Sequence, residues 1–392
     1  MFKIAAWYDN YQAPAVLMID DLSDAYIDLY PESYKNDWGY LGDKEGSAYN
    51  FLQKELLDFY PDIKITFFVP YLRHGILNEN CKYPIQKNAL GERLEYQQFL
   101  QKLIASGHEI SHHGSNHGRY INPNLCTVGQ NWIHEWALFD TVEKGVNVTQ
   151  KGVELFKQTT GITIVGGKYC GYVAIQNSAE IIDQCNFLYW CDNGHYQSND
   201  THYFGKNRIF SFPTSFAGNK FIRLSYITGD ASRDRQKRYM KYLQPLYNLL
   251  AYYQLYQLYK HRKIISIQEH ISPSTTWGTV QSSNIVTDIK SLNKIFGFLR
   301  PRNIWYATCA EIATYRYIKE NSILEWDSNK LTIYFTNTRK LSETVLSITH
   351  QNPFSLQQEC VIYHSEQKNG LQTVNIPITD GYNEFEYTLK DN

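Results

Sequence analysis

The sequence predicts an α/β fold built on a largely parallel sheet or barrel, followed by a small antiparallel β-sandwich domain. From the start to about residue 320, apolar strand-like runs alternate with helical patterns, which is typical of βα units. After Tyr317 the pattern changes to short segments in which apolar and polar residues alternate, as in an antiparallel sheet with one wet face. We therefore place the domain boundary near Asn321, with residues 1–320 in the first domain and 321–392 in the second.

The expected elements of the first domain follow from apolar runs and helical spacing. The expected strands are residues 16–19, 65–69, 162–165, 187–190, 221–227 and 264–267. The expected helices are residues 50–59, 94–106, 132–144, 178–184, 233–260 and 283–298, the second of which stops at Gly107 in an αL cap. The strands expected in the second domain are residues 330–335, 344–349, 359–364, 371–376 and 384–389.

Composition excludes several classes of partner. The 392 residues are 43% apolar and carry a formal net charge of −1, so the chain can bury a sizeable core and has no basic run for nucleic acid or an anionic membrane. No stretch of about 18 apolar residues is present, so we expect no membrane insertion. Residues 1–9 lack the apolar segment of a signal peptide, and a cytoplasmic location is expected. The seven cysteines are scattered without a Cys-x-x-Cys pair, which predicts free thiols.

The most informative stretch is residues 107–117, which holds four of the twelve histidines and sets His113 and His117 four apart. Side chains four apart share one face of a helix or helix-initiating turn, so both imidazoles could bind one metal ion. A hydrolytic zinc site usually keeps three protein ligands, and the buried run 13–19 leads directly into Asp20 and Asp21. Successive strand residues point to opposite faces, so both acids can serve one site only if the backbone turns sharply there. On their own, the two acids would be better interpreted as a helix N-cap.

Five segments resemble motifs of a known family and follow one another in the same order as those motifs. They are residues 16–21, 65–69, 107–117 and 265–270, and residues 304–308 just before Glu311. Over roughly residues 10–317 the chain resembles the NodB-type polysaccharide deacetylases of carbohydrate esterase family 4. The resemblance implies a distorted (β/α) barrel of seven strands.

The resemblance also implies roles for individual residues. Asp20 corresponds to the catalytic base, and Asp21, His113 and His117 to the metal ligands. His270 corresponds to the general acid, although a histidine after an apolar strand is often only a core or rim residue. By ligand type the divalent metal is expected to be Zn²⁺, and an Asp-His-His site would also take Co²⁺ or Ni²⁺. His108 and His112 are expected to be structural.

Three departures from the family pattern concern the residues around the base. Leu22 stands where the family usually has Gly, so the turn must be made without that residue. The arginine motif is reduced to residues 166–171, in which Lys168 would offer a point charge in place of a bidentate fork. The aspartate that tunes the acid is matched only loosely by Asp192. Tyr172 and Trp277 could line a sugar-binding groove, and a core or rim position is an equal alternative.

These observations predict a metal-dependent hydrolase that removes an N-acetyl group from an acetamido sugar in a glycan or an activated glycan precursor. One alternative keeps the fold and changes the reaction, as in a deformylase or another amidohydrolase. A second alternative is a non-catalytic glycan-binding protein built on a degenerate deacetylase. The β-domain could bind glycan, shield the barrel or mediate an oligomer, and nothing in its strands chooses among these.

Overall fold

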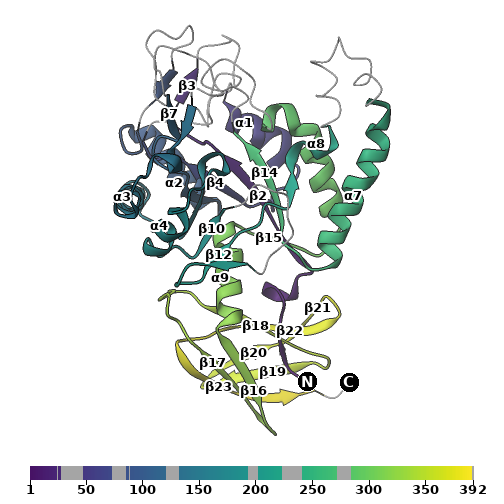
Figure 1. Cartoon of the computed structure of the whole chain (residues 1–392). Helices are drawn as coiled ribbons and strands as arrows, with labels where there is room; N and C mark the ends of the chain where they lie inside the picture. Colours follow the sequence, from purple (N-terminus) through teal and green to yellow (C-terminus); the bar gives the residue numbers. More distant parts are fainter. Residues whose placement is uncertain are drawn as a thin grey trace.

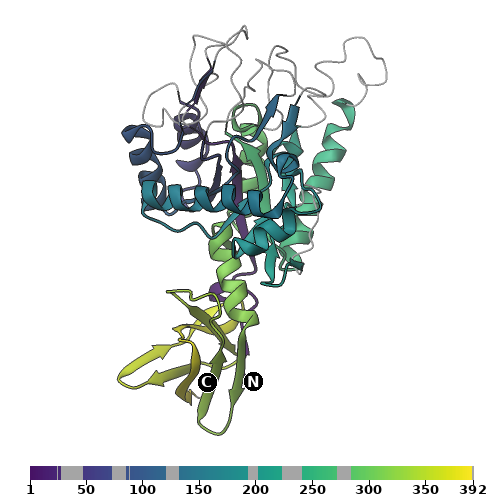
Figure 2. The same ribbon diagram turned by 60° about the vertical axis from the view of Figure 1, so that its left-hand side comes forward.

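The computed structural model describes residues 1–23, 25–27, 47–72, 85–87, 89–120, 132–192, 202–222, 241–271 and 284–390. Two parts are visible in Figure 1, an α/β domain above and a β-sandwich below. Both chain termini lie at the sandwich end of the molecule, which Figure 2 shows from a second direction.

The α/β domain is organised around a curled, open sheet of ten strands. Its order is β11-β12-β10-β9-β6-β4-β2-β14-β13, with β15 also paired to β2, and every pairing is parallel except that of β11 with β12. The strands are β2 (Ala13–Asp20), β4 (Ile65–Val69), β6 (Glu109–His112), β9 (Gly166–Lys168), β10 (Tyr189–Cys191), β11 (Tyr203–Phe204), β12 (Ile209–Ser211), β13 (Phe216–Ala217), β14 (Ile265–His270) and β15 (Ile304–Tyr306). The predicted α/β class and distorted barrel are confirmed, with ten strands in the sheet where the resemblance implied seven.

Both faces of this sheet are covered by buried side chains, which is why all eight residues of β2 are buried. Leu17 and Ile19 pack with the helices of the outer layer, whereas Val16 and Met18 face a second core shared with the last helix of the domain. The helices are α1 (Ala48–Leu52), continued by a π-helical turn (Gln53–Leu57), α2 (Leu94–Ala105), α3 (Val142–Thr160), α4 (Ser178–Gln184), α7 (Gln244–Lys260), α8 (Ile285–Leu299) and α9 (Cys309–Glu320). Helix α9 leads directly into the sandwich (Figure 1).

One predicted helix is wrong. Residues 132–144 form strand β8 (Trp132–His134) and a 3-10 turn (Glu135–Leu138), and α3 begins only at Val142. The Thr141 side chain caps α3 by accepting a hydrogen bond from the Lys144 N–H, and Gly161 ends it with φ = 81°. Both boundary signals are in the sequence, and the bulky apolar residues before them were wrongly assigned to the helix.

Two predicted strands are also displaced. The strand expected at residues 162–165 begins instead at Gly166, and Phe221 closes a 3-10 turn (Gly218–Phe221) after strand β13. The remainder of the expected strand 221–227, after residue 222, and the first part of the expected helix 233–260 lie outside the described residues. Two small antiparallel pairs complete the domain, β3 (Ala25–Ile27) with β5 (Ile85–Lys87) and β7 (Gly118–Tyr120) with β8.

The C-terminal part consists of two antiparallel sheets that enclose one apolar core. Burial alternates along the strands as the sequence pattern predicts, with Leu331, Ile333 and Phe335 buried in β17. One sheet has the order β1 (Lys3–Ile4), β18 (Val345–His350), β22 (Leu371–Pro377) and β21 (Glu366–Lys368). The other has the order β16 (Ser322–Trp326), β17 (Lys330–Phe335), β23 (Gly381–Leu389), β19 (Phe354–Gln358) and β20 (Val361–His364).

The first strand of the chain belongs to this C-terminal sheet, because Lys3 and Ile4 pair with Thr349 and Ile348 of β18. The domain boundary near Asn321 stays a prediction. In the structure, one sheet of the C-terminal part also includes this N-terminal strand. No helix among the described residues is long and apolar enough to cross a membrane. The cysteines within the described part of the chain, Cys170, Cys185, Cys191, Cys309 and Cys360, are free thiols, and Cys81 and Cys126 lie outside it.

Candidate active site

Most of the predicted site residues that the structure describes gather at the carboxyl edge of the central sheet. Asp20 ends β2, His270 ends β14 directly beside it in the register, Lys168 ends β9, and His113 follows β6. Parallel strands present their carboxyl ends at one edge, so four segments far apart in the sequence converge there.

The backbone turns sharply after β2, as a shared role for the two acids requires. Asp21 has φ = 68°, in the left-handed region that aspartate tolerates better than most residues. The turn therefore needs no glycine at position 22, and Leu22 is fully buried. Both carboxyl groups are nearly inaccessible, with 4% of Asp20 and 1% of Asp21 exposed.

Three predicted metal ligands lie at ligand-like separations. Asp21 Oδ1 is 3.4 Å from His113 Nε2 and 3.3 Å from His117 Nε2. Two nitrogen or oxygen ligands on one tetrahedral zinc ion, each about 2.0–2.1 Å from the metal, are about 3.3–3.4 Å apart. The donor atoms present therefore fit a divalent ion of that size.

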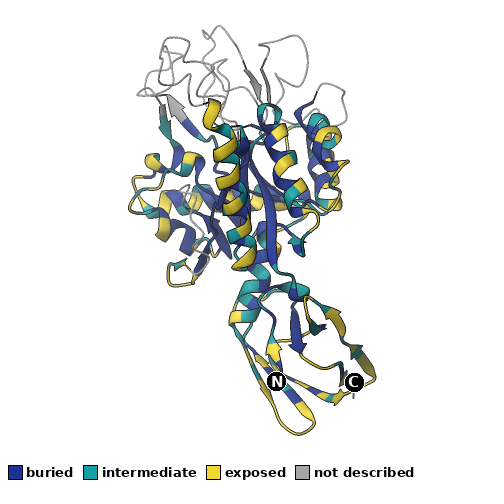
Figure 3. Cartoon of the chain, turned by 90° about the vertical axis from the view of Figure 1, so that its right-hand side faces the viewer, coloured by how far each residue is buried: buried dark blue, intermediate teal, exposed yellow. Residues whose placement is uncertain are grey.

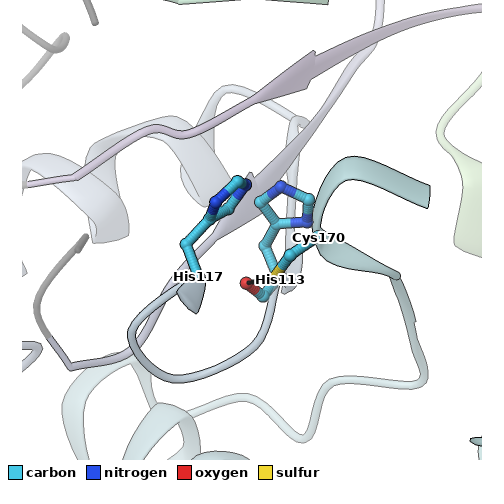
Figure 4. A group of neighbouring side chains, drawn as sticks. All are labelled: His113, His117 and Cys170. Atoms are coloured by element: carbon cyan, nitrogen blue, oxygen red, sulfur yellow. Dashed lines mark hydrogen bonds between the residues drawn. The ribbon is translucent and has the colours of Figure 1, made fainter. Parts of the chain in front are cut away.

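Cys170 is a fourth candidate ligand, which sequence reasoning missed. His113, His117 and Cys170 each offer one ligand atom within 4.8 Å of the others, and Figure 4 shows the two imidazoles next to each other with Cys170 close to His113. The Cys170 thiol donates to the His113 carbonyl at 3.0 Å. Burial, followed by the nearby Glu135, Asp21 and Asp20 carboxylates, raises the pKa of this thiol well above its usual value. A lone cysteine in a shortened motif gives no sequence signal, which is why sequence reasoning missed Cys170.

The backbone of β9 orients His113. Its Nδ1 lies 3.2 Å from the Lys168 carbonyl oxygen, so an Nδ1–H tautomer donates there and leaves the Nε2 lone pair facing Asp21. Burial lowers the pKa of His113, but the Asp20 and Asp21 carboxylates outweigh it, and the net shift is upward.

Glu135 holds the loop that carries His117. Its carboxylate accepts hydrogen bonds from three successive backbone N–H groups, those of Ser115, Asn116 and His117, at 2.7–3.1 Å, and from the Ser115 hydroxyl at 2.8 Å. The loop needs this support because His117 has φ = 65°, which is strained for a residue with a side chain, whereas Gly114 adopts φ = 76° without strain. Burial raises the pKa of Glu135, and the backbone donors oppose that rise. Sequence reasoning missed Glu135, which it placed inside a helix.

Lys168 and Asp20 form a buried ion pair. Lys168 Nζ lies 2.9 Å from Oδ1 and 2.8 Å from Oδ2 of Asp20, and the lysine is fully buried. The ammonium also donates to Gln268 Oε1 and lies 4.4 Å from the centre of the Tyr172 ring. Lys168 therefore reaches the expected base, as a single charge shared by both carboxylate oxygens.

Asp20 lies between the metal ligands and His270. Its Oδ2 is 4.0 Å from His113 Nε2 and 4.0 Å from His270 Nε2, and the His270 side chain keeps 22% of its surface exposed. A carboxylate in this position can accept a proton on one side and face an acid on the other.

Of the two expected substrate-binding aromatics, Tyr172 lies beside this group and Trp277 lies outside the described residues. The Tyr172 hydroxyl donates to Gln268 Oε1 at 3.2 Å and is 2.6 Å from Thr214 Oγ1. Gln268, which sequence reasoning did not single out, thus ties Tyr172 and Lys168 together.

Asp192 is the predicted site residue that the structure does not bring to this group. It accepts a hydrogen bond from the Ser211 hydroxyl at 2.5 Å, and within the described part of the chain its side chain makes no other hydrogen bond or ion pair. Strand β10 ends one residue earlier, so Asp192 is turned toward β12. The expected tuning of His270 by Asp192 therefore has no contact to support it.

The other histidines of the motif form scaffold. His112 Nδ1 accepts the Gly114 N–H at 2.9 Å, and burial lowers its pKa to about 3. His108 Nδ1 accepts the Ile65 N–H at 3.3 Å, and burial lowers its pKa to about 4. Both rings are held neutral as acceptors of backbone hydrogen bonds, as expected for structural histidines.

Fold and site together define an α/β protein with a candidate metal centre at the carboxyl edge of its sheet. No family model and no curated protein matches the sequence. Among solved structures, PuuE allantoinase is 13% identical with a TM-score of 0.42, over 79% of this chain and 92% of that one. A family 4 acetyl xylan esterase from Clostridium thermocellum in complex with a cobalt ion is 11% identical with a TM-score of 0.36, over 76% and 90%. A CE4 family pseudoenzyme from Bacillus anthracis is 11% identical with a TM-score of 0.36, over 78% and 66%. These TM-scores are below 0.5, so the residue roles depend on the chain's own motifs and geometry.

Proposed function

We propose that the chain is a metal-dependent hydrolase that removes an N-acetyl group from an acetamido sugar in a glycan or an activated glycan precursor. The observation that carries the proposal is the convergence of Asp21, His113 and His117 at 3.3–3.4 Å, with Asp20 placed 4.0 Å from both His113 and His270. Amide hydrolysis needs an electrophile, a base for the attacking water and an acid for the leaving amine. The sugar substrate is inferred from the motif resemblance alone.

Each residue of the group then has a role. Asp21, His113 and His117 would hold the ion, for which Zn²⁺ is proposed and Co²⁺ or Ni²⁺ are alternatives. When bound, a divalent ion polarises an amide carbonyl and lowers the pKa of a bound water. Asp20 accepts the proton of the attacking water, with its two oxygens held by Lys168, and His270 gives a proton to the departing nitrogen. A cytoplasmic nucleotide- or lipid-linked precursor is the substrate that we propose for testing first.

The test separates metal binding from turnover. Acetate release is measured on a panel of chitooligosaccharides and UDP-N-acetylhexosamines, and bound metal is quantified on the same samples. Asp20→Asn is expected to keep the metal and lose at least about a thousandfold in turnover, because the base is gone while the ligands remain. His113→Ala is expected to lose both. The matched controls change exposed residues of the same types, Asp58→Asn and His202→Ala, and should leave both readouts unchanged.

Full activity of Asp20→Asn would place the base elsewhere, and a stoichiometric ion retained by His113→Ala would exclude that residue as a ligand. Release of formate from N-formyl sugars, without acetate from N-acetyl sugars, would favour a deformylase. The second candidate function is a glycan-binding protein without activity, and the one observation for it is that Asp192, matched to the residue that would tune the acid, is bonded to Ser211. That second candidate is supported if the panel binds and no acyl group is released.

A further inference from the structure

Helix α7 carries a stripe of large apolar side chains that nothing in the described chain covers. Figure 3, in which the right-hand side of Figure 1 faces the viewer, shows exposed residues along the length of this helix. In a globular protein such a face usually packs on another element. The exposed fractions, including the preceding turn, are Tyr242 70%, Leu243 53%, Leu246 57%, Leu249 66%, Leu250 58%, Tyr253 62% and Tyr256 44%.

The opposite face of α7 already has its partner. Ala251, Leu255 and Leu258 are buried among the outer-layer core residues, and Tyr252 packs against Phe221 with ring centres 4.5 Å apart and the rings tilted by 50°. The helix is therefore apolar on two sides, one facing the sheet and one facing outward. The outer stripe does not belong to this buried core, so another molecule can pack on it.

The spacing of the stripe matches a helix–helix seam. Within α7, residues 246, 249, 253 and 256 follow one another at intervals of three, four and three, which is the a/d repeat of packed helices. This pattern is symmetric about a point midway between residues 249 and 253, so an antiparallel copy would place Leu246 against Tyr256 and Leu249 against Tyr253. A seam that is complementary to itself is what an isologous twofold interface requires.

Area and charge both favour a second copy of this chain. Seven side chains, each exposing on the order of 100 Å², offer roughly 700 Å², close to the roughly 800 Å² per partner of a standard interface. From Tyr242 to Tyr259 the chain has no charged residue, so two copies would meet without repulsion. A membrane surface is less well matched, because interfacial helices carry lysines and arginines beside their apolar face and α7 ends with Lys260 alone.

We propose that α7 is the homodimer interface of this protein, formed by antiparallel packing of two copies about an axis between Leu249 and Tyr253. The interface lies on the α/β domain and leaves the C-terminal sandwich outside the contact. It is independent of the proposed reaction, because none of the stripe residues belongs to the candidate active site.

The test measures the oligomeric state of the full-length protein by sedimentation equilibrium across the micromolar range. The wild type is expected to be a dimer, and the double change Leu249→Glu with Tyr253→Glu is expected to weaken it at least about a hundredfold, because buried like charges would face each other. Both residues are exposed in the monomer, so the fold should be retained, as checked by circular dichroism. The matched control is Val361→Glu on β20, an equally exposed position of the sandwich at 51%, which should leave the dimer intact.

Cysteines on the two sides of the seam give a second readout. The double change Leu249→Cys with Tyr253→Cys is expected to form disulfides between copies under mild oxidation, identified by mass spectrometry of the linked peptides, because residue 249 of one copy faces residue 253 of the other. A wild type that is monomeric throughout the concentration range would overturn the proposal. So would a dimer that resists Leu249→Glu with Tyr253→Glu but dissociates with Val361→Glu, or a monomer that floats with lipid vesicles through the same stripe.

Discussion

The two ends of this molecule bury different chemistry. At the carboxyl edge of the central sheet the chain buries Asp20, Asp21, Lys168, His113 and Glu135, all at most 4% exposed. The described part of the sandwich buries a core of aliphatic and aromatic side chains, together with a few polar residues such as Ser347 and Asn383, and no Asp, Glu, Lys or Arg. Buried charges cost free energy even when they are paired, so a cluster of them at one sheet edge is a candidate site of chemistry. The sandwich core is expected to act on stability.

The largest expected effect comes from leaving one charge of the sheet edge without its partner. Lys168→Met keeps the length of the side chain and removes the ammonium that lies 2.8–2.9 Å from both oxygens of Asp20. We expect the free energy of unfolding of the metal-free protein to fall by about 3–5 kcal/mol, because the carboxylate stays buried and uncompensated. Urea unfolding followed by circular dichroism measures this change.

The double variant Asp20→Asn with Lys168→Met is the control, since it removes both charges together. It should recover part of the loss that Lys168→Met causes. A loss below about 1 kcal/mol for Lys168→Met is the size expected of a solvent-exposed ion pair. It would mean that the sheet edge does not bury an ion pair, and the two ends of the molecule would then not differ in this way.

A cavity in the sandwich core should lower the free energy of unfolding without changing metal affinity or turnover. Ile348 on β18 is fully buried in the sandwich core, and Ile348→Ala is expected to cost about 3 kcal/mol through lost burial and the cavity that remains. Metal affinity and turnover should not change, because no site residue belongs to this core. Urea unfolding and metal titration of the same sample measure both. A parallel fall in metal affinity would show that the sandwich supports the site and is more than a separate source of stability.

Glu109 tests how a buried acid outside the site behaves. Its carboxylate accepts hydrogen bonds from Thr66, Tyr189 and the Ala310 N–H at 2.7–3.0 Å, yet burial raises its pKa to about 7. The folded state thus holds a proton that the unfolded state releases near pH 4.5. This contribution to stability is complete below pH 4.5 and is lost as pH rises through 7, by about 2 kcal/mol between pH 5 and 7.

Glu109→Gln cannot titrate and should lack this part of the pH dependence. Thermal or urea unfolding of both proteins at several pH values gives the difference, and Glu154→Gln, which changes an exposed glutamate, should keep the slope of the wild type. If the slopes of the wild type and Glu109→Gln coincide, the carboxyl of Glu109 is ionised in the folded state throughout this range.

The sequence predicts well those features that depend on residues close together in the chain, such as strands and the turn after Asp20. The apolar run before Asp20 and Asp21 predicts a buried strand that ends at its carboxyl edge, and the predicted turn is present with Asp21 at φ = 68°. The period of two in the last part of the chain predicts its antiparallel strands. These features depend on neighbours in sequence, so composition and spacing are enough to find them.

The contacts that complete the site join residues far apart in the chain. Gln268 meets Lys168 across 100 positions, and no local pattern marks either of them as a partner of the other. Asp192 was assigned to the site because it loosely matches a motif. It lies one residue after β10, and its side chain accepts a hydrogen bond from Ser211. Glu135 was hidden by an incorrect helix, because Trp132 and Trp136 resemble an apolar helical face as well as a strand and a turn.

The smallest effect, and the one that connects scaffold and site most directly, concerns Glu135. The Glu135 carboxylate holds the N–H groups of Ser115, Asn116 and His117, so Glu135→Gln removes a charged acceptor while keeping the shape of the side chain. We expect metal affinity to fall by about tenfold or somewhat more, as for other groups that orient a metal ligand, because His117 must then hold φ = 65° with weaker support. Competition with a chelator, using zinc or cobalt, measures the affinity of the folded protein. Glu154→Gln makes the same chemical change on the exposed face of α3 and should leave the affinity unchanged. An unchanged affinity in Glu135→Gln would mean that the loop holds His117 without this carboxylate, and the buried charge would then serve the fold alone.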